Sequence, residues 1–204
     1  MSRTSTKAAP PKAAAAPKAA ERILATASEL FYREGARAVG VDEIVVRAGT
    51  TKPSLYRAFE SKDHLIAAYL EGRSADAWSW FEKAAAAHPG DPRAQVLDYI
   101  DALSGRALKG GYRGCGLSNA AIEYPEAGHP GRKVSVKHKE KLRERLRDLT
   151  RAMGARKPRK LADSLLLIIE GVHVTSQLFG AEGPAAAARG AAETLIDAHM
   201  RGHV

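Results

Sequence analysis

The sequence has one cysteine, no long apolar run and few signs of β-strands, and each absence excludes a class of protein. The single Cys115 cannot form an internal disulfide, which argues against a disulfide-stabilised secreted domain. The longest apolar run, Leu165 to Ile169, is far shorter than the roughly 20 residues of a membrane-spanning helix. The first twenty residues lack the apolar segment of a signal peptide, so we expect a cytoplasmic protein with no membrane partner.

The signatures of common enzyme sites are also missing. The glycine-rich stretch KGGYRGCG has neither the G-x-G-x-x-G nor the Walker spacing, and no predicted strand precedes it. No Ser/His/Asp order and no cluster of metal-ligating side chains stands out. We therefore expect no catalytic residues, no metal and no cofactor, and the protein is not predicted to be an enzyme.

Positive charge is abundant but unevenly placed. The 204 residues carry a formal net charge of +9, and residues 132–160 alone hold 13 Lys and Arg against 3 Asp and Glu. Residues 1–20, rich in Ala, Pro and Lys, predict a disordered basic arm. Positive charge attracts nucleic acid without selecting a sequence, so a nonspecific, architectural DNA-binding protein is one interpretation. For the basic helix at 132–153, an amphipathic helix with a solvated basic face is the favoured interpretation, and a secondary DNA contact or an anionic ligand are the alternatives.

Helical periodicity runs through almost the whole chain. Apolar side chains at Ile23, Ala27, Leu30 and Phe31 share one face of a helix that ends near Gly35. Similar patterns, punctuated by Gly and Pro, continue to the end of the chain. The chain is therefore predicted to be all-α, with about nine helices, near residues 21–34, 42–48, 52–59, 61–88, 93–108, 117–123, 132–153, 158–179 and 184–200.

One short tract, AGTTKPSLYRAFESK at residues 48–62, carries the strongest functional signal. A helix, a turn containing Gly49 and a second short helix make a helix-turn-helix, whose second helix lies in the DNA major groove. Pro53 fits the first turn, where backbone amides have no helical partner, and Leu55 and Phe59 are predicted to face the core. The outward polar side chains suit phosphate and base contacts. The predicted DNA contacts are Thr50, Thr51, Lys52, Ser54, Tyr56, Arg57 and Lys62.

From Glu21 to about Leu70 the sequence resembles the DNA-binding domain of the tetracycline-repressor (TetR) family. The matching stretches are ILATASELFYREG, VDEIVVRAG and TTKPSLYRAFESKDHL. Three positions depart from the family pattern: Pro53 replaces a common Gly, Ala58 replaces a frequent His or Tyr, and Gly40 stands where Thr or Ser often caps the second helix. The loss of that hydroxyl leaves Gly40 only its amide for DNA.

The resemblance implies a domain plan and a mode of action. After the arm at 1–20, residues 21–67 would form the helix-turn-helix domain and residues 68–204 a helical ligand-binding and dimerisation domain. A homodimer would bind a palindromic double-stranded DNA operator, with its recognition helices about 34–36 Å apart. A small-molecule effector bound in the C-terminal domain would release the DNA, as expected for a repressor.

The C-terminal part gives weaker signals. Side chains with an apolar body and a polar tip are candidates for a ligand pocket: Trp80, Tyr99, Tyr112, Cys115, Asn119, Tyr124, His173 and Gln177. Ordinary core or rim positions are the competing interpretation for each of them. For Cys115, next to Arg113, a thiol-based sensor of redox state or electrophiles is an alternative function. By the resemblance, the last two helices supply the dimer interface, through Leu165, Ile169, Val172, Ala187, Ala191 and Leu195.

Overall fold

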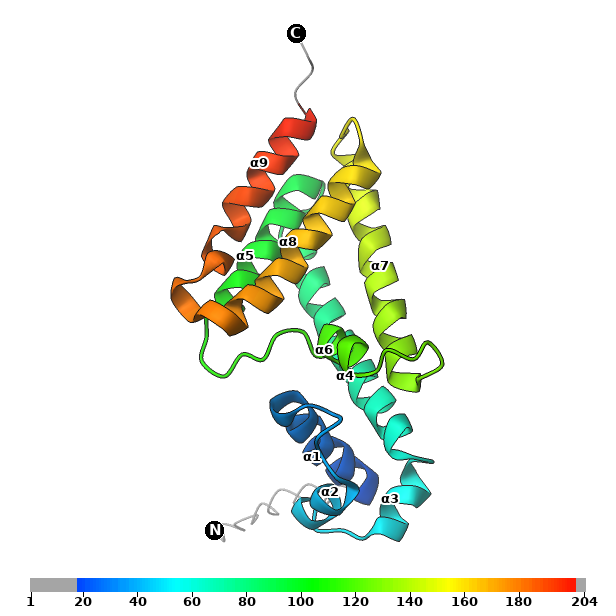
Figure 1. The fold of residues 1–204 in the computed structure, drawn as a ribbon. Coiled ribbons are helices and arrows are strands. Elements are labelled where there is room, and N and C mark those ends of the chain that lie inside the picture. The colour runs from blue at the N-terminus through cyan, green and yellow to red at the C-terminus, as the bar shows by residue number, and fades with distance from the viewer. Residues whose placement is uncertain (1–17, 201–204) are drawn as a thin grey trace, which may run out of the picture.

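The computed structural model describes residues 18–200, and all regular structure in this range is helical (Figure 1). Residues 1–17 of the predicted arm lie outside the described residues, and the first helix already begins at Ala19. The prediction of an all-α chain with nine α-helices is confirmed for the described range. The helices are α1 (Ala19–Glu34), α2 (Val41–Arg47), α3 (Lys52–Ala58), α4 (Lys62–Ala86), α5 (Pro92–Ala107), α6 (Gly116–Glu123), α7 (Pro130–Ala152), α8 (Pro158–Phe179) and α9 (Ala188–Met200), with short 3-10 helices at Gly180–Glu182 and Pro184–Ala187.

The three N-terminal helices and the start of α4 enclose a first hydrophobic core. Ile23 of α1, Ile44 of α2 and Leu55 of α3 are completely buried and belong to one cluster. Leu65 and Leu70 of α4 belong to the same cluster, so α1, α2 and α3 share their hydrophobic core with the long helix α4. Burial of these side chains, rather than the intrinsic stability of two seven-residue helices, holds α2 and α3 in place.

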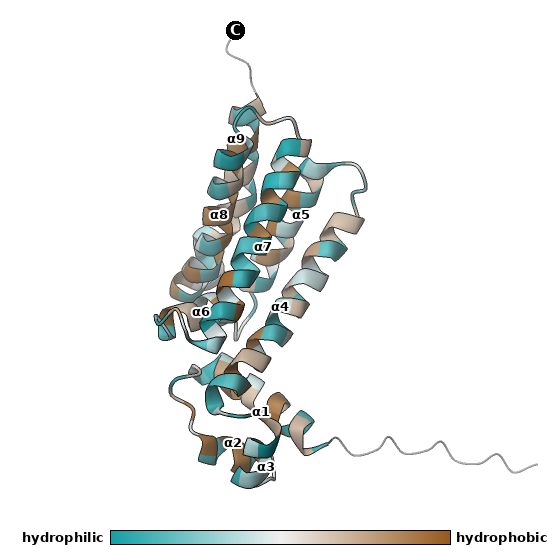
Figure 2. Ribbon diagram, turned by 90° about the vertical axis from the view of Figure 1, so that its right-hand side faces the viewer, coloured by the Kyte–Doolittle hydropathy of each residue, from teal (hydrophilic) through white to brown (hydrophobic). Residues whose placement is uncertain are grey.

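A second core lies between α5, α7, α8, α9 and the distal half of α4. Its members include Phe81 of α4, Ile100 of α5, Leu146 of α7 and Ile196 of α9, all almost fully buried. Figure 2 shows α4 running from the N-terminal helices up along this bundle. Because α4 is a single helix of 25 residues, the predicted domain boundary between residues 67 and 68 falls inside it, and the change of core occurs between Leu70 and Phe81.

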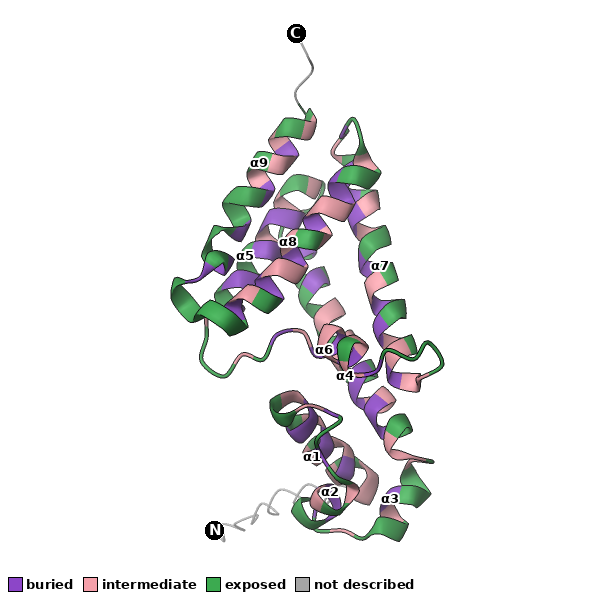
Figure 3. Cartoon of the chain, in the orientation of Figure 1, coloured by how far each residue is buried: buried purple, intermediate pink, exposed green. Residues whose placement is uncertain are grey.

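Helix α8 combines a buried stripe with an exposed apolar one. The segment Pro158–Glu182 is long and apolar enough to cross a membrane, with a mean hydropathy of 1.3. A search for uninterrupted apolar runs misses it, because polar residues divide its apolar sequence. Its inner stripe packs against α5, α7 and α9. The outer stripe is exposed, with Leu167 at 73%, Val174 at 51% and Leu178 at 70% (Figure 3).

This arrangement revises the predicted dimer interface. Leu165, Ile169 and Val172 are 0–2% exposed within a single chain, so they have no surface left for a partner to cover. They form the chain's own core because they face α5, α7 and α9. Ala187 and Ala191 are exposed and Leu195 is half-buried, so for these three the interface remains a prediction.

Candidate DNA interface and ligand cavity

The turn between α2 and α3 depends on the backbone freedom of glycine. Gly49 has φ 58°, in the left-handed region where a side chain is strained. The amide of Thr50 donates to the carbonyl of Val45 at 2.9 Å, which closes the end of α2. The chain then turns directly into α3, as the helix-turn-helix prediction requires.

Helix α3 begins at the predicted cap. The Oγ1 of Thr51 accepts a hydrogen bond from the Ser54 amide at 3.4 Å, and Pro53 stands in the first turn. Leu55 faces inward with no exposed surface, and Phe59 is partly buried against the same core. The opposite side of α3 is therefore presented to solvent (Figure 3).

The residues predicted to contact DNA differ in solvent exposure and in whether they already have an ionic partner. Lys52, Tyr56 and Arg57 are exposed, whereas Thr50 and Ser54 are half-buried. Among the described residues, no carboxylate lies within 4.0 Å of the Arg57 guanidinium, so its charge is available to an anion.

Two of the predicted cations already have partners. Lys52 Nζ lies 2.7 Å from Asp42 Oδ1, and this hydrogen bond, together with the aspartate charge, raises the pKa of Lys52. Lys62 Nζ donates to the Arg37 carbonyl at 3.3 Å, and burial lowers the pKa of Lys62. If either lysine contacts DNA phosphate, as predicted, the phosphate competes with this protein partner.

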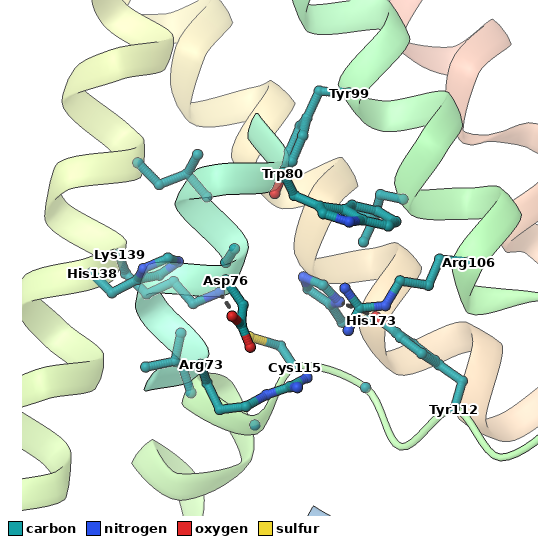
Figure 4. A pocket seen from close by; sticks show the side chains of 16 residues that line it. Arg73, Asp76, Trp80, Tyr99, Arg106, Tyr112, Cys115, His138, Lys139 and His173 are labelled. Carbon is teal, nitrogen blue, oxygen red and sulfur yellow. Dashed lines mark hydrogen bonds between the residues drawn. The ribbon is translucent and has the colours of Figure 1, made fainter. Parts of the chain in front are cut away.

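A cavity of about 50 Å³ lies between α4, α5, α7, α8 and the segment that leads from α5 to α6 (Figure 4). Its wall combines aromatic, basic and apolar side chains. They are Arg73, Asp76, Ala77, Trp80, Tyr99, Leu103, Arg106, Tyr112, Gly114, Cys115, Gly116, Leu117, His138, Lys139, Leu142 and His173. As it stands, this volume has room for a few water molecules only.

The two cavity histidines are neutral near pH 7. Tyr112 Oη and His173 Nδ1 are 2.6 Å apart, and their rings are stacked. Burial, followed by the nearby charge of Lys139, lowers the pKa of His173 to about 4. The same two causes lower the pKa of His138 to about 4, and its Nδ1 lies 2.9 Å from Ser74 Oγ. Both imidazoles therefore offer hydrogen bonds rather than charge.

A charged group of side chains ties three helices together beside the cavity. Lys139 Nζ of α7 lies 2.6 Å from Glu170 Oε1 of α8, and Glu170 Oε2 accepts from Ser118 Oγ of α6 at 2.7 Å. The same Nζ lies 3.4 Å from Cys115 Sγ. Burial lowers the pKa of Lys139, but the charges of Cys115 and Glu170 and its hydrogen bonds to them outweigh burial, and the net direction is upward.

The connection from α5 to α6, which includes Arg113 and Gly114 and forms the floor of the cavity, packs closely against α1 and α8. Gly114 has φ 73°, and a Cβ there would lie 2.3 Å from Gln177 Nε2 and 3.0 Å from the His173 carbonyl. On the other side, Tyr32 Oη of α1 accepts from the Arg113 amide at 3.0 Å and donates to the Gly114 carbonyl at 3.4 Å. The segment that forms the floor thus contacts the DNA-binding domain directly.

Comparison with known proteins identifies the family. The family model for bacterial regulatory proteins of the tetR family matches residues 23–69. A TetR transcriptional regulator from Streptomyces avermitilis is 31% identical, with 91% of this chain and 100% of that chain covered and a TM-score of 0.81. The protein belongs to the TetR family. It is therefore a DNA-binding transcriptional regulator and not an enzyme, and α8 is a core helix of its C-terminal domain.

Two further relatives are similar to this chain over very different lengths. The regulator SCO4454 of Streptomyces coelicolor is 27% identical over 90% of this chain and 96% of that one, with a TM-score of 0.85. The transcriptional activator FasR of Mycolicibacterium smegmatis is 48% identical over 50 residues, which are 24% of this chain and only 23% of FasR. The match thus covers less than a quarter of FasR.

The cavity brings together five of the eight predicted pocket residues: Trp80, Tyr99, Tyr112, Cys115 and His173. The other three lie elsewhere. Gln177 is exposed and packs beside Gly114. The side-chain amide of Asn119 donates through Nδ2 to the Arg113 carbonyl at 2.8 Å, outside the cavity. Tyr124 is buried in the N-terminal core, where its ring stacks on His129, so the prediction for these three is wrong for this cavity.

Sequence reasoning missed the cavity's basic residues, because charged side chains were assigned to solvated faces. A helical spacing could have found two of them. Arg106 continues the inward row Tyr99 and Leu103 at i, i+4 and i+7, and His138 stands four residues before the buried Leu142. The position of Lys139 depends on its pairing with Glu170, which lies on another helix and leaves no local signal.

Proposed function

We propose that this TetR-family protein is a cytoplasmic repressor that binds a palindromic operator as a homodimer. A small molecule bound in the cavity between α4, α5, α7 and α8 (the α4–α8 cavity) would release it from DNA. The observation that carries the proposal is the position of α4. Its first turns, with Leu65 and Leu70, belong to the DNA-binding core, and its middle, with Arg73 and Trp80, lines the cavity. A change in the cavity wall is therefore a change in the support of the recognition helix.

Two further contacts support a route from cavity to DNA. Tyr32 of α1 hydrogen-bonds the cavity floor at Arg113 and Gly114. At the end of α6, Glu123 Oε2 accepts from the Arg37 amide at 2.8 Å, in the connection between α1 and α2. Because the cavity measures only about 50 Å³, we expect an organic ligand to displace α4, α6 or the floor. Such a ligand can act only through unequal affinity for the two arrangements.

The exposed stripe on α8 supports the homodimer. Leu167, Gly171, Val174 and Leu178 recur at intervals of four, three and four residues, the spacing of a helix-packing seam. A Cβ added at Gly171 would meet open space, so a partner helix can approach the centre of the seam closely. Paired with α9 and the turn before it, which expose Ala191 and Ala187, this face suits a second copy of the chain.

The proposal is tested by a competition gel shift with the DNA upstream of the protein's own gene. At about 150 mM salt, near physiological ionic strength, the fragment should bind at least tenfold tighter than random DNA. Equal binding to both would replace specific repression by the alternative of a nonspecific architectural protein. A transcription assay on the same fragment then gives the sign of regulation, and a repressor should reduce the transcript.

Variants of α3 sharpen this test. Arg57→Ala should weaken operator binding by about 1–3 kcal/mol if the guanidinium contacts a base, with little change for random DNA. Lys52→Ala should weaken both DNAs alike if the ammonium, which is now paired with Asp42, contacts a phosphate, because phosphates carry no sequence information. Arg151→Ala, at the far end of α7, is the control. Unchanged operator affinity in both α3 variants would show that α3 is not the recognition helix.

Thiol sensing through Cys115 is a second candidate for the signal that releases DNA. The specific observation in its favour is the 3.4 Å contact between Lys139 Nζ and Cys115 Sγ at the cavity wall. A cationic neighbour makes a thiol a better nucleophile.

A further inference from the structure

We infer that the α4–α8 cavity takes a small planar organic anion, with Arg106 and Arg73 holding its negative group. The inference rests on the proposed function of the cavity as the effector site and names the chemical class of that effector. It is carried by two half-buried guanidinium groups that line one cavity and have no carboxylate partner there.

Arg106 is oriented by aromatic rings instead of by an acid. Its Cζ lies 4.8 Å from the centroid of the Trp80 ring and 5.9 Å from that of Tyr112. Within residues 18–200, no carboxylate oxygen comes within 4.0 Å of it, although the chain forms such pairs at many exposed arginines. A guanidinium stacked on rings keeps its edge, with its N–H donors, free for a bidentate acceptor.

Arg73 repeats this arrangement on α4. Its Cζ lies 4.7 Å over the ring of Tyr32, and it too lacks a carboxylate within 4.0 Å among the described residues. The acid in the cavity wall, Asp76, is exposed and forms no ion pair among the described residues. Because Lys139 is matched by Glu170, the two arginines outnumber the remaining acid, and the cavity keeps a positive surplus.

The remaining wall determines the body of the ligand. Trp80, Tyr99 and Tyr112 supply flat apolar faces, and Leu103, Leu117 and Leu142 close the space around them. The histidines add neutral hydrogen-bonding groups. Their low pKa values follow from burial first and then from the charge of Lys139, with Arg106 contributing at His173, which agrees with a positive potential inside the cavity. Inorganic anions would leave the aromatic faces unused, so the wall favours an anion with a planar carbon skeleton.

A matched pair of fluorescent probes tests the inference on the full-length protein. Anilinonaphthalene sulfonate is an anion with flat aromatic rings, and phenylnaphthylamine is the same skeleton without the sulfonate. The anion should bind at least tenfold tighter than the neutral probe, and Arg106→Gln should weaken the anion by roughly ten- to a hundredfold, the range for losing a charge-assisted hydrogen bond. Arg73→Gln should act in the same direction, and Arg106→Lys should restore part of the loss.

Controls locate the effect in the cavity. Arg151→Gln removes an equal charge at the exposed end of α7 and should leave both probes unchanged. The neutral probe should bind the Arg106→Gln protein as it binds the wild type, which shows that the cavity still folds. Equal affinity for the two probes, binding of neither probe, or anion binding that survives both arginine substitutions would overturn the inference.

The same probes separate this inference from the proposed function. If the anion binds through Arg106 but leaves the operator complex intact at saturation, the cavity takes anions and its proposed role in releasing DNA fails. If the neutral probe releases DNA as well as the anion does, the effector function stands and the anionic class is wrong.

Discussion

At the scale of single residues, some side chains of the cavity wall could be predicted from the sequence and others could not. Tyr112 and His173 could be predicted, because an apolar body with a polar tip on an apolar helix suits a pocket wall. Arg106 was missed because it carries a charge, although its spacing from Tyr99 and Leu103 indicates an inward position. Its contacts to Trp80 and Tyr112 involve other segments and could not be predicted. Asp42 had no predicted role either, yet it decides that Lys52 is paired while Arg57 is free.

Cys115 provides the test at this scale. We expect N-ethylmaleimide to alkylate Cys115 and to weaken operator binding, because the adduct is larger than the cavity of about 50 Å³ can hold. Cys115→Ser should keep wild-type operator affinity and resist the reagent. Lys139→Gln should slow the alkylation, measured by mass spectrometry, since the cationic contact to the thiol is lost. Equal loss of DNA binding in the serine variant would exclude thiol sensing.

At the scale of helices, local rules were sufficient where a helix is short and capped. The hydroxyl of Thr51, the first-turn Pro53 and Gly49 with its positive φ all agree with the sequence-based prediction of α3. Helix α8 shows where such rules stop. It carries two apolar stripes, and periodicity alone does not tell which one faces the chain's own core. The packing of α5, α7 and α9 makes that choice, so the stripe first assigned to the dimer turned out to be core.

The outer stripe of α8 leads to a prediction about assembly. Leu167→Glu and Leu178→Glu should convert the proposed dimer to monomers, because each places a charge where about 1.5–3 kcal/mol of leucine burial is expected on pairing. Light scattering after size exclusion gives the mass, and operator affinity should fall with it. Ile122→Glu changes an equally exposed apolar residue on α6 and should leave the mass unchanged. A dimer that survives both α8 substitutions would place the interface elsewhere.

At the scale of the whole molecule, acid should loosen the C-terminal core. His173 and His138 have an ordinary pKa of 6.5 and a folded-state pKa of about 4. Between these values the unfolded chain takes up protons that the folded chain refuses, so stability falls as the pH drops from about 6.5 towards 4. At pH 5 the loss from His173 is at most about 2 kcal/mol.

Urea unfolding at neutral pH and at pH 5 measures this loss. His173→Gln keeps an acceptor for Tyr112 but cannot titrate, so the difference between the two pH values should shrink relative to the wild type. The carboxylates are common to the wild type and the variant, so their contributions cancel in the comparison. An unchanged difference would mean that His173 is protonated in the folded protein at pH 5.

The shared helix α4 also limits where this chain can change its length. Its inward positions serve the N-terminal core up to Leu70 and the C-terminal core from Phe81 onward. Each residue of an α-helix turns the next by about 100°, so one inserted residue between these points would rotate the recognition helix by that angle about the axis of α4. We therefore expect the connection before α5 to accept insertions and deletions, whereas a change of length in α4 between the two cores would turn one domain relative to the other.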